Sequence, residues 1–416
     1  QVGKYSHAMR CNKEGILQYI AYSRYRDSTG DTDFYYHGYR VHNEHMLAWA
    51  AMFAGNFEIA IEAAEAPNRT TSSVLFHRWI DWLEPYSTDA WHVLIRFGKW
   101  HEILLRPLPA ASPSMVKHGT PRRTVSQEMC SPNSDCDGLE ESVFLVGTAY
   151  GHYAKGIAHA ALGDVSNARK EQQLFRLSVK RVPTTRYLHN VPSLRSLAVA
   201  ESMLDGEIEY RAGNMNMAFQ QLREAVSRED NLPYDEPPGW MFPTRHALGA
   251  LTLEQAQIIL QKGESLLSCS QNEIEERAHK ACNLLAEAEE CYKNDLQHFP
   301  NNIWSFIGMK NCMLLILHFH VLCEDPNNGV VIKRILHSSS TRLNKVLLDV
   351  SYLKNELLKL DSSIQRMSHF ASKELSSNLT TNSNQLNHNC DANSNGNKYN
   401  NCDYSPMVSC FCAGRL

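Results

Sequence analysis

One short pattern recurs five times along the chain, and it constrains the fold more than any other feature. Each copy has a glycine, then a polar residue, then an apolar residue that is followed three positions later by Ala or Ile. The copies begin at Gly3, Gly55, Gly98, Gly163 and Gly213. Glycine can adopt the left-handed conformation that ends a helix, and a polar residue directly after it can cap the next helix. The pattern therefore predicts helix hairpins that turn at these glycines.

The residues between the glycines have the spacing of packed helices. Before Gly213, for example, Leu197, Ala200, Leu204 and Ile208 follow one another at steps of three or four. Sustained alternation of polar and apolar residues, which would indicate strands, is nearly absent. We therefore predict an all-α fold, an α-solenoid of about six degenerate helix hairpins.

Several segments also resemble a known repeat. Ala288, Tyr292 and Pro300 fit the second half of the tetratricopeptide (TPR) repeat. More narrowly, the chain resembles a family of TPR-domain proteins with no assigned activity. The resemblance spans residues 1–315, and its matching segments are residues 35–45, 96–104, 232–240 and 245–249. It implies that the hairpins are TPR-like, although the glycines are more widely and less regularly spaced than the 34-residue period of a simple TPR array.

The chain is predicted to have three parts. Residues 1–325 form the TPR-like helical-repeat domain, which contains a proline-rich mobile insertion at 107–140 and a second insertion at 261–277. Residues 326–371 carry apolar residues at helical spacing and are predicted to form a helical extension or cap. Residues 372–416 are rich in Asn and Ser, so we expect a disordered tail.

Composition limits the partners and the location. The 41 Lys and Arg residues are balanced by 45 Asp and Glu residues, a net charge of −4, so no strongly basic surface for nucleic acid is expected. The longest apolar run, residues 312–323, is well short of the roughly 20 residues that span a bilayer, so no membrane association is expected. The 12 cysteines contain no CxxC pair and are predicted to be reduced. These features indicate an intracellular, cytoplasmic protein.

The first candidate site is a pair of histidines. His42 and His45 are three residues apart on one predicted helix, and two imidazoles at this spacing can bind one metal ion. A zinc site would need a third ligand from another hairpin, for which His152 is the candidate. The alternative is that these histidines pack at hairpin interfaces and hydrogen-bond to backbone or to tyrosines.

The second candidate site is a loop at residues 234–246. Its prolines exclude helix and hold the loop rigid, while its carboxylates could meet a cation or an amine. The candidate binding residues are Tyr234, Asp235, Glu236, Trp240, Arg245 and His246. The alternative is that Tyr234 and Trp240 fill the groove between hairpins while Asp235 pairs with Arg245.

No nucleophile, nucleotide or metalloprotease motif is present in the sequence, and we assign no catalytic residue. The favoured function is a non-enzymatic protein-interaction scaffold, without a cofactor, that binds a peptide or partner helix in a concave groove. The alternative is a metal-dependent enzyme or small-molecule-binding protein, whose site combines the His42 and His45 helix with the 234–246 loop. The alternative gains if folding brings the 42–45 face within a few ångströms of the 234–246 loop or of His152 in an enclosed pocket, and the scaffold gains if these residues are spread along an open groove.

Overall fold

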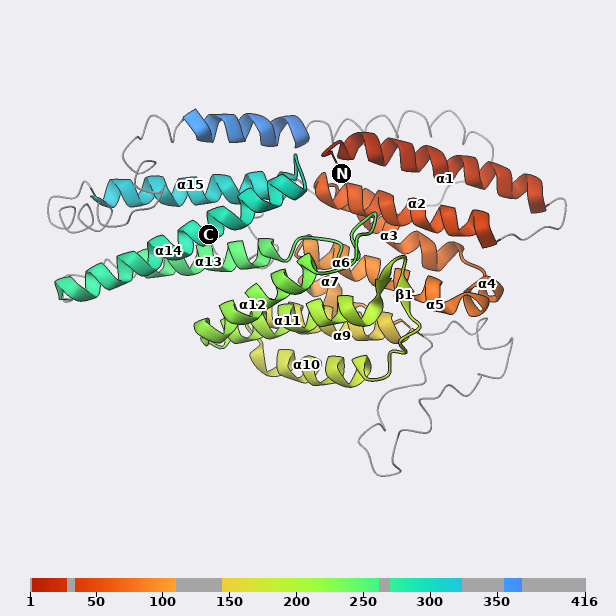
Figure 1. The fold of residues 1–416 in the computed structure, drawn as a ribbon, viewed down its shortest axis with the longest axis horizontal. Helices are drawn as coiled ribbons and strands as arrows, with labels where there is room; N and C mark the ends of the chain where they lie inside the picture. Colours follow the sequence, from red (N-terminus) through yellow and green to blue (C-terminus); the bar gives the residue numbers. More distant parts are fainter. Residues whose placement is uncertain (1, 28–33, 110–143, 262–269, 324–354, 369–416) are drawn as a thin grey trace, which may run out of the picture.

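The computed structural model describes residues 2–27, 34–109, 144–261, 270–323 and 355–368. Nearly all of these residues are helical, and the prediction of an all-α fold is confirmed (Figure 1). The predicted tail at 372–416 lies outside the described residues.

Helices of one to eight turns follow one another along the chain, as Figure 1 shows. In order they are α1 (Tyr5–Asp27), α2 (Phe34–Phe53), α3 (Phe57–Thr70), α4 (Ser73–Arg78), α5 (Ile80–Leu83), η1 (Glu84–Thr88), α6 (Asp89–Arg96), α7 (Trp100–Leu105), α9 (Leu145–Ala161), α10 (Val165–Val179), α11 (Ser193–Arg211), α12 (Met215–Asp230), α13 (Arg245–Gln261), α14 (Gln271–His298) and α15 (Ile303–Cys323). A further helix covers residues 355–368. Within the described ranges the sheet content is one antiparallel pair, β1 (Tyr187–Leu188) with β2 (Val191–Pro192).

Four of the five glycines of the recurring pattern, Gly55, Gly98, Gly163 and Gly213, lie between two helices, as predicted, and Gly3 precedes α1. All five have φ between 65° and 86°. At the corner after α2, the Gly55 N–H donates to the Met52 carbonyl (3.1 Å) and the Asn56 N–H donates to the Ala51 carbonyl (2.9 Å). This pair of bonds is the Schellman arrangement, which satisfies the last carbonyls of a helix. The Asn56 side chain then accepts from the Ile59 N–H and caps α3. Antiparallel hairpins result at α2–α3, α6–α7, α9–α10 and α11–α12.

The last hairpin returns to the first. The Asn301 side-chain amide, between α14 and α15, donates to the Gly3 carbonyl (3.2 Å). The Trp304 indole N–H donates to the Met52 carbonyl at the end of α2 (2.8 Å), and the rings of Phe53 and Phe299 lie 5.1 Å apart. Each unit of a simple solenoid contacts only its neighbours. Here the packing also joins elements that are far apart in sequence, and the N-terminus lies beside the α14–α15 corner (Figure 1).

The apolar core lies between the helix layers and has a small outlying part that supports the site described below. Its main clusters run through α6–α15 and through α1–α3 with α6. The outlying part consists of Val41, Phe76, Leu83, Tyr86, Phe144 and Leu188. In the described parts of the chain, no helix combines the length and apolar character that crossing a membrane requires.

The predicted insertion at 261–277 is too long. Although residues 262–269 lie outside the described part, residues 271–277 belong to α14, because Ser270 and Glu273 form a reciprocal capping box that starts this helix. Of the predicted insertion at 107–140, residues 110–140 are not described. Within the predicted extension at 326–371, the helix at 355–368 packs near α15, where Lys310 and Asp361 form an ion pair of 2.6 Å.

The glycine corners make a stability prediction. Gly163 has a φ of 85°, and a Cβ built there would meet no atom within 4 Å, so Gly163→Ala should cost only the backbone strain. We expect a loss of about 1–2 kcal/mol in the free energy of unfolding, measured with urea. Gly3→Ala should cost more, because its Cβ would lie 2.2 Å from the Pro300 carbonyl oxygen. Gly163→Asn is the control and should lose less than Gly163→Ala, because Asn tolerates this conformation; a Gly163→Ala chain as stable as the parent would contradict the argument.

Candidate functional site

Three segments that are distant in sequence meet at His189, at the tip of the β1–β2 hairpin. The His189 Nε2 atom lies 3.4 Å from His42 Nδ1 on α2, and it is also hydrogen-bonded to the Tyr86 hydroxyl of η1. The His189 Nδ1 atom lies 3.5 Å from Asp235 Oδ1, in the loop before α13. We call His42, Tyr86, His189 and Asp235 the histidine junction.

The backbone at His189 is held in an unusual conformation. Its φ is 47°, in the left-handed region that residues other than glycine rarely adopt. The next residue ties the tip to the loop, since the Asn190 N–H donates to Asp235 Oδ2 (3.2 Å) and its side-chain amide donates to the Tyr234 carbonyl (3.4 Å). The Glu236 N–H donates to the other Asp235 oxygen (3.0 Å). Strained residues held in this way are common at functional sites.

A buried ion pair links two of the segments that form the junction, η1 and the β1–β2 hairpin. Glu84 is fully buried, accepts a hydrogen bond from the Gly147 N–H (2.9 Å) and lies 3.3 Å from Arg186 Nε. Burial raises the pKa of Glu84 to about 7, against the opposing effects of these partners. Arg186 also pairs with Asp81 of α5. Because Glu84 shortly precedes Tyr86 and Arg186 shortly precedes His189, this contact holds two junction residues in register.

A third histidine packs against the junction. His45 Nδ1 is 2.6 Å from Asp89 Oδ2, and both side chains are completely buried. The His45 ring lies 5.3 Å from the Tyr86 ring and 5.5 Å from the His189 ring. The described residues offer His45 Nε2 no hydrogen-bond partner. A buried imidazole with one free nitrogen thus packs directly against the junction.

The surroundings keep His42 and Tyr86 neutral. Burial, with the neighbouring His189 and His45, lowers the pKa of His42 to about 4, although Asp235 and Glu236 oppose this. Burial and the nearby carboxylates of Asp89 and Asp235 raise the pKa of Tyr86. At neutral pH His42 is therefore an uncharged imidazole and Tyr86 a phenol that donates to His189 Nε2. This assignment leaves the His189 proton on Nδ1, facing Asp235. Neutral imidazoles can accept a proton or coordinate a metal ion.

Only some residues of the two predicted candidate sites come together in the folded chain. Of the first, His42 belongs to the junction, whereas His45 turns inward to Asp89. Of the second, Asp235 belongs to the junction and Glu236 is next to it. Tyr234 is 74% exposed and its hydroxyl donates to Glu236.

The rest of the 234–246 segment is buried elsewhere. Trp240 packs in the core, with its ring 4.8 Å from that of His92. Arg245 pairs with Asp230 (2.7 Å), so the expected pairing of Arg245 with Asp235 is wrong. His246 joins a buried network in which Arg96 lies 2.9 Å from Nδ1, while Ser305 (2.7 Å) and Asp295 (3.1 Å) approach Nε2. These side chains connect α6, α13, α14 and α15 and are not part of the junction.

The predicted grouping of His42, His45 and His152 is not formed. His152 Nδ1 lies 2.7 Å from Glu171 Oε2, which joins α9 to α10. His45 is already engaged by Asp89. Across the described ranges, no three His, Cys, Asp or Glu side chains are grouped so as to hold a metal ion.

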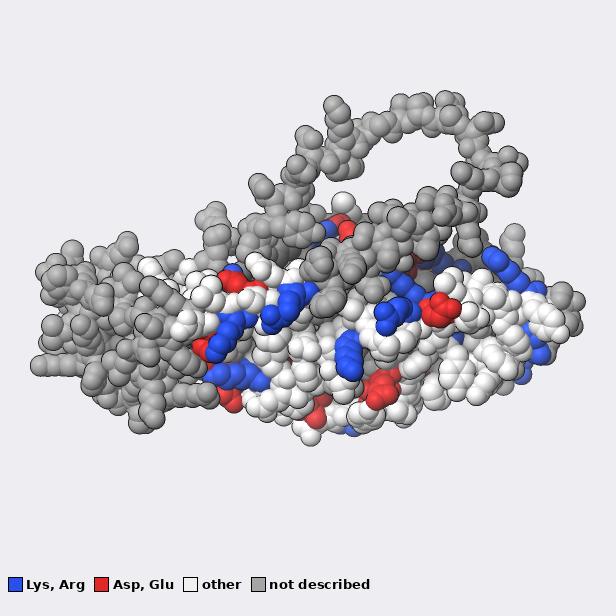
Figure 2. All heavy atoms as spheres, turned by 90° about the horizontal axis from the view of Figure 1, so that it is seen from above, with Lys and Arg blue, Asp and Glu red and all other residues white. Residues whose placement is uncertain are grey.

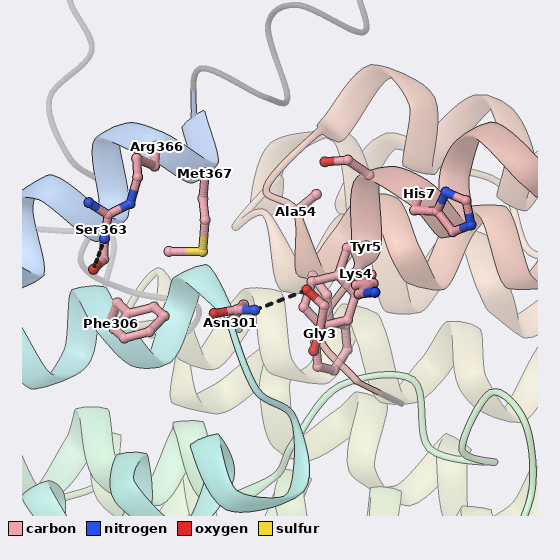
Figure 3. A pocket seen from close by; sticks show the side chains of 12 residues that line it. Gly3, Lys4, Tyr5, His7, Ala54, Asn301, Phe306, Ser363, Arg366 and Met367 are labelled. Carbon is pink, nitrogen blue, oxygen red and sulfur yellow. Dashed lines mark hydrogen bonds between the residues drawn. The ribbon is translucent and has the colours of Figure 1, made fainter.

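A cavity of about 470 Å³ opens at another place, between the start of α1, the end of α2, the start of α15 and the helix at 355–368 (Figure 3). Phe53, Phe306 and Met367 line it together with Lys4 and Arg366. It contains none of the candidate residues predicted from the sequence.

Figure 2 looks onto α1 and the helix at 355–368, and Lys and Arg are interspersed with Asp and Glu among the described residues on this face.

Comparison with known proteins gives no relative. No protein-family model, no curated protein and no solved structure matches the chain. The function is therefore inferred from the geometry of the site.

The buried His92 on α6 predicts a pH dependence of stability. Burial, with the neighbouring His45, lowers the pKa of His92 to about 3, so His92 stays neutral in the folded chain while it gains a proton below about pH 6.5 in the unfolded chain. Its contribution to stability is therefore complete above pH 6.5 and is lost as the pH falls towards 3. His92→Phe removes this effect and fits the aromatic surroundings. Between pH 7 and pH 5 the free energy of unfolding, measured with urea, should fall by about 2 kcal/mol less in His92→Phe than in the parent.

The exposed His101 on α7 provides the control. His101→Phe should keep the pH dependence of the parent. An identical pH dependence in His92→Phe and the parent would show that His92 is not held neutral by burial.

Proposed function

We propose that the chain is a small-molecule-binding protein whose ligand site is the histidine junction. The observation that carries this proposal is the convergence of α2, η1, the β1–β2 hairpin and the 234–236 loop on His189, whose backbone is strained and whose side chain is 19% exposed. Convergent polar groups with shifted pKa values on a rigid scaffold are typical of ligand sites.

The chemistry of the junction selects a polar ligand. His42 and His189 are imidazoles that can each donate or accept a hydrogen bond, and Asp235 and Glu236 add carboxylates at the same edge. A ligand with amine or hydroxyl groups would satisfy both kinds of partner. The meeting of His42 with the 234–236 loop favours this function over the peptide-binding scaffold, because polar side chains that converge from separate elements are typical of a small-molecule site.

A ligand screen tests the proposal. The parent chain, His189→Ala and the control His101→Ala are heated with a panel of amino acids, polyamines, sugars and nucleosides, with zinc or with a chelator. We expect at least one compound to raise the melting temperature of the parent and of His101→Ala but not of His189→Ala. A ligand at 100 times its Kd stabilises a fold by about 2.7 kcal/mol, which such a screen detects.

A compound that binds in the cavity of Figure 3, and not at the junction, would contradict the proposal. A compound bound there would keep its effect in His189→Ala and lose it in Met367→Trp, which fills the cavity. If every active compound behaves in this way, or none is active, the junction is not the ligand site.

The scaffold function is the second candidate, and exposed tyrosines favour it. Tyr25, Tyr35, Tyr36 and Tyr39 of α1 and α2 are 67%, 59%, 40% and 54% exposed. Tyrosine supplies a large apolar surface with a polar end and is frequent in protein interfaces. We propose that a peptide partner would contact this tyrosine face.

Peptide selection separates the two functions. Peptides selected from a library on the parent chain should lose at least tenfold in affinity for a Tyr35→Ser, Tyr39→Ser double variant and keep their affinity for His189→Ala. Tyr25→Ser tests whether the face extends to α1. Failure to select any peptide that depends on these tyrosines would count against the scaffold.

A further inference from the structure

We propose that the histidine junction binds a divalent transition-metal ion, with His42 Nδ1, His189 Nε2 and the Tyr86 oxygen as ligands. The inference rests on the proposed function, since the ion would form part of the same ligand site. The three donor atoms come from α2, the β1–β2 hairpin and η1, and they face one another at the junction.

The separation of the two imidazoles fits a shared ion. His42 Nδ1 and His189 Nε2 are 3.4 Å apart, which is long for a hydrogen bond. Two nitrogens that are each 2.0–2.1 Å from a tetrahedral zinc ion lie about 3.3 Å from each other. An ion can therefore be placed between these atoms with little movement of either ring.

The tyrosine supplies the third donor. Its hydroxyl contacts the same His189 nitrogen, so the oxygen has to move outward to about 3.3 Å from that nitrogen to share the ion with it. Binding replaces the Tyr86 O–H bond by an oxygen–metal bond, and one proton leaves to solvent. A bound cation stabilises the phenolate that burial alone disfavours.

Asp235 has the place of a supporting carboxylate. Histidines that bind metals usually donate their other ring N–H to a carboxylate or carbonyl, which fixes the tautomer and the ring orientation. Asp235 lies on the Nδ1 side of His189 and leaves Nε2 for the ion. Asp235 is itself held by the N–H groups of Asn190 and Glu236.

The proposed set differs from the one expected from the sequence. Although the described part of the chain contains no triplet of His, Cys, Asp and Glu suited to a metal, this set has only two histidines and takes its third donor from a tyrosine. Nitrogen and oxygen donors suit zinc, copper or cobalt. His189 is partly exposed, so the junction reaches the surface, and water or the polar ligand would take the fourth position, as in catalytic zinc sites.

Metal titration tests this inference on the full chain after treatment with a chelator. Calorimetry with Zn²⁺ and visible absorption with Co²⁺ should show one ion per chain, with release of a proton that Tyr86→Phe abolishes. The dissociation constant should rise at least 100-fold in His42→Ala and in His189→Ala, and 10–100-fold in Asp235→Asn. It should be unchanged in His101→Ala.

The controls keep the outcome decisive. Each variant is first shown to be folded by circular dichroism, and His189→Gln replaces His189→Ala if the latter does not fold. His7 and Cys11 lie 3.6 Å apart on the exposed face of α1 and could bind zinc adventitiously, so Cys11→Ser is titrated in parallel. Absence of binding, or binding that survives in both His42→Ala and the His189 variant, overturns the inference.

The two proposals can fail separately. If the chain binds no ion at the junction but a polar compound still stabilises the parent and not His189→Ala, the metal site is rejected and the ligand site stands. If an ion binds but no compound depends on His189, the metal site stands and the small-molecule function is rejected.

Discussion

The whole arrangement depends on chain reversal at residues with a positive φ. A helix can be followed directly by an antiparallel partner only if its last carbonyls are satisfied and the chain turns sharply, and glycine permits both without steric cost. At Gly55, Gly98, Gly163 and Gly213 the corner needs almost no loop, so the two helices of each hairpin pack along most of their length. His189 also has a positive φ but lacks the conformational freedom of glycine. There the hydrogen bonds of the neighbouring Asn190 to the 234–236 loop offset the backbone strain.

Buried polar contacts determine how the hairpins meet. Glu84 with Arg186 joins η1 to the β1–β2 hairpin, and His246 with Asp295 joins α13 to α14. An apolar interface tolerates some sliding, whereas a buried charge must stay beside its partner because an unpaired charge in the interior is strongly unfavourable. The geometry of the histidine junction therefore depends on the buried contact of Glu84 with Arg186, which holds η1 and the β1–β2 hairpin together.

The sequence predicted the helices and their corners because these follow from local rules. It placed His42 and His45 on one helix, but their different roles depend on tertiary contacts. Residues three apart on a helix diverge by about 60° around the axis, which is enough for His45 to reach Asp89 while His42 reaches His189. Asp235 lies in the histidine junction, whereas Trp240 and His246, which residue type does not separate from it, are buried elsewhere.

His189, Tyr86 and Asp89 were missed for a physical reason. The β1–β2 hairpin has strands of two residues each, which are too short for any alternation to be recognised. Its tip has no glycine, the usual sign of a tight turn. Tyr86 lies in the short 3-10 helix η1, and Asp89 is the first residue of the next helix. Burial sets the position of this segment, so only the folded chain brings the two residues to the histidines.

The contact of Asn301 with Gly3 has a consequence for how this chain loses its structure. Linear arrays of repeats can fray from either end, one unit after another, because a terminal unit has a neighbour on one side only. Here the start of α1 contacts the α14–α15 corner, although 298 residues separate the two partners in sequence. Fraying of α1 therefore also breaks contacts with the α14–α15 corner, and these contacts form only after a large loss of chain entropy because their partners are so distant in sequence.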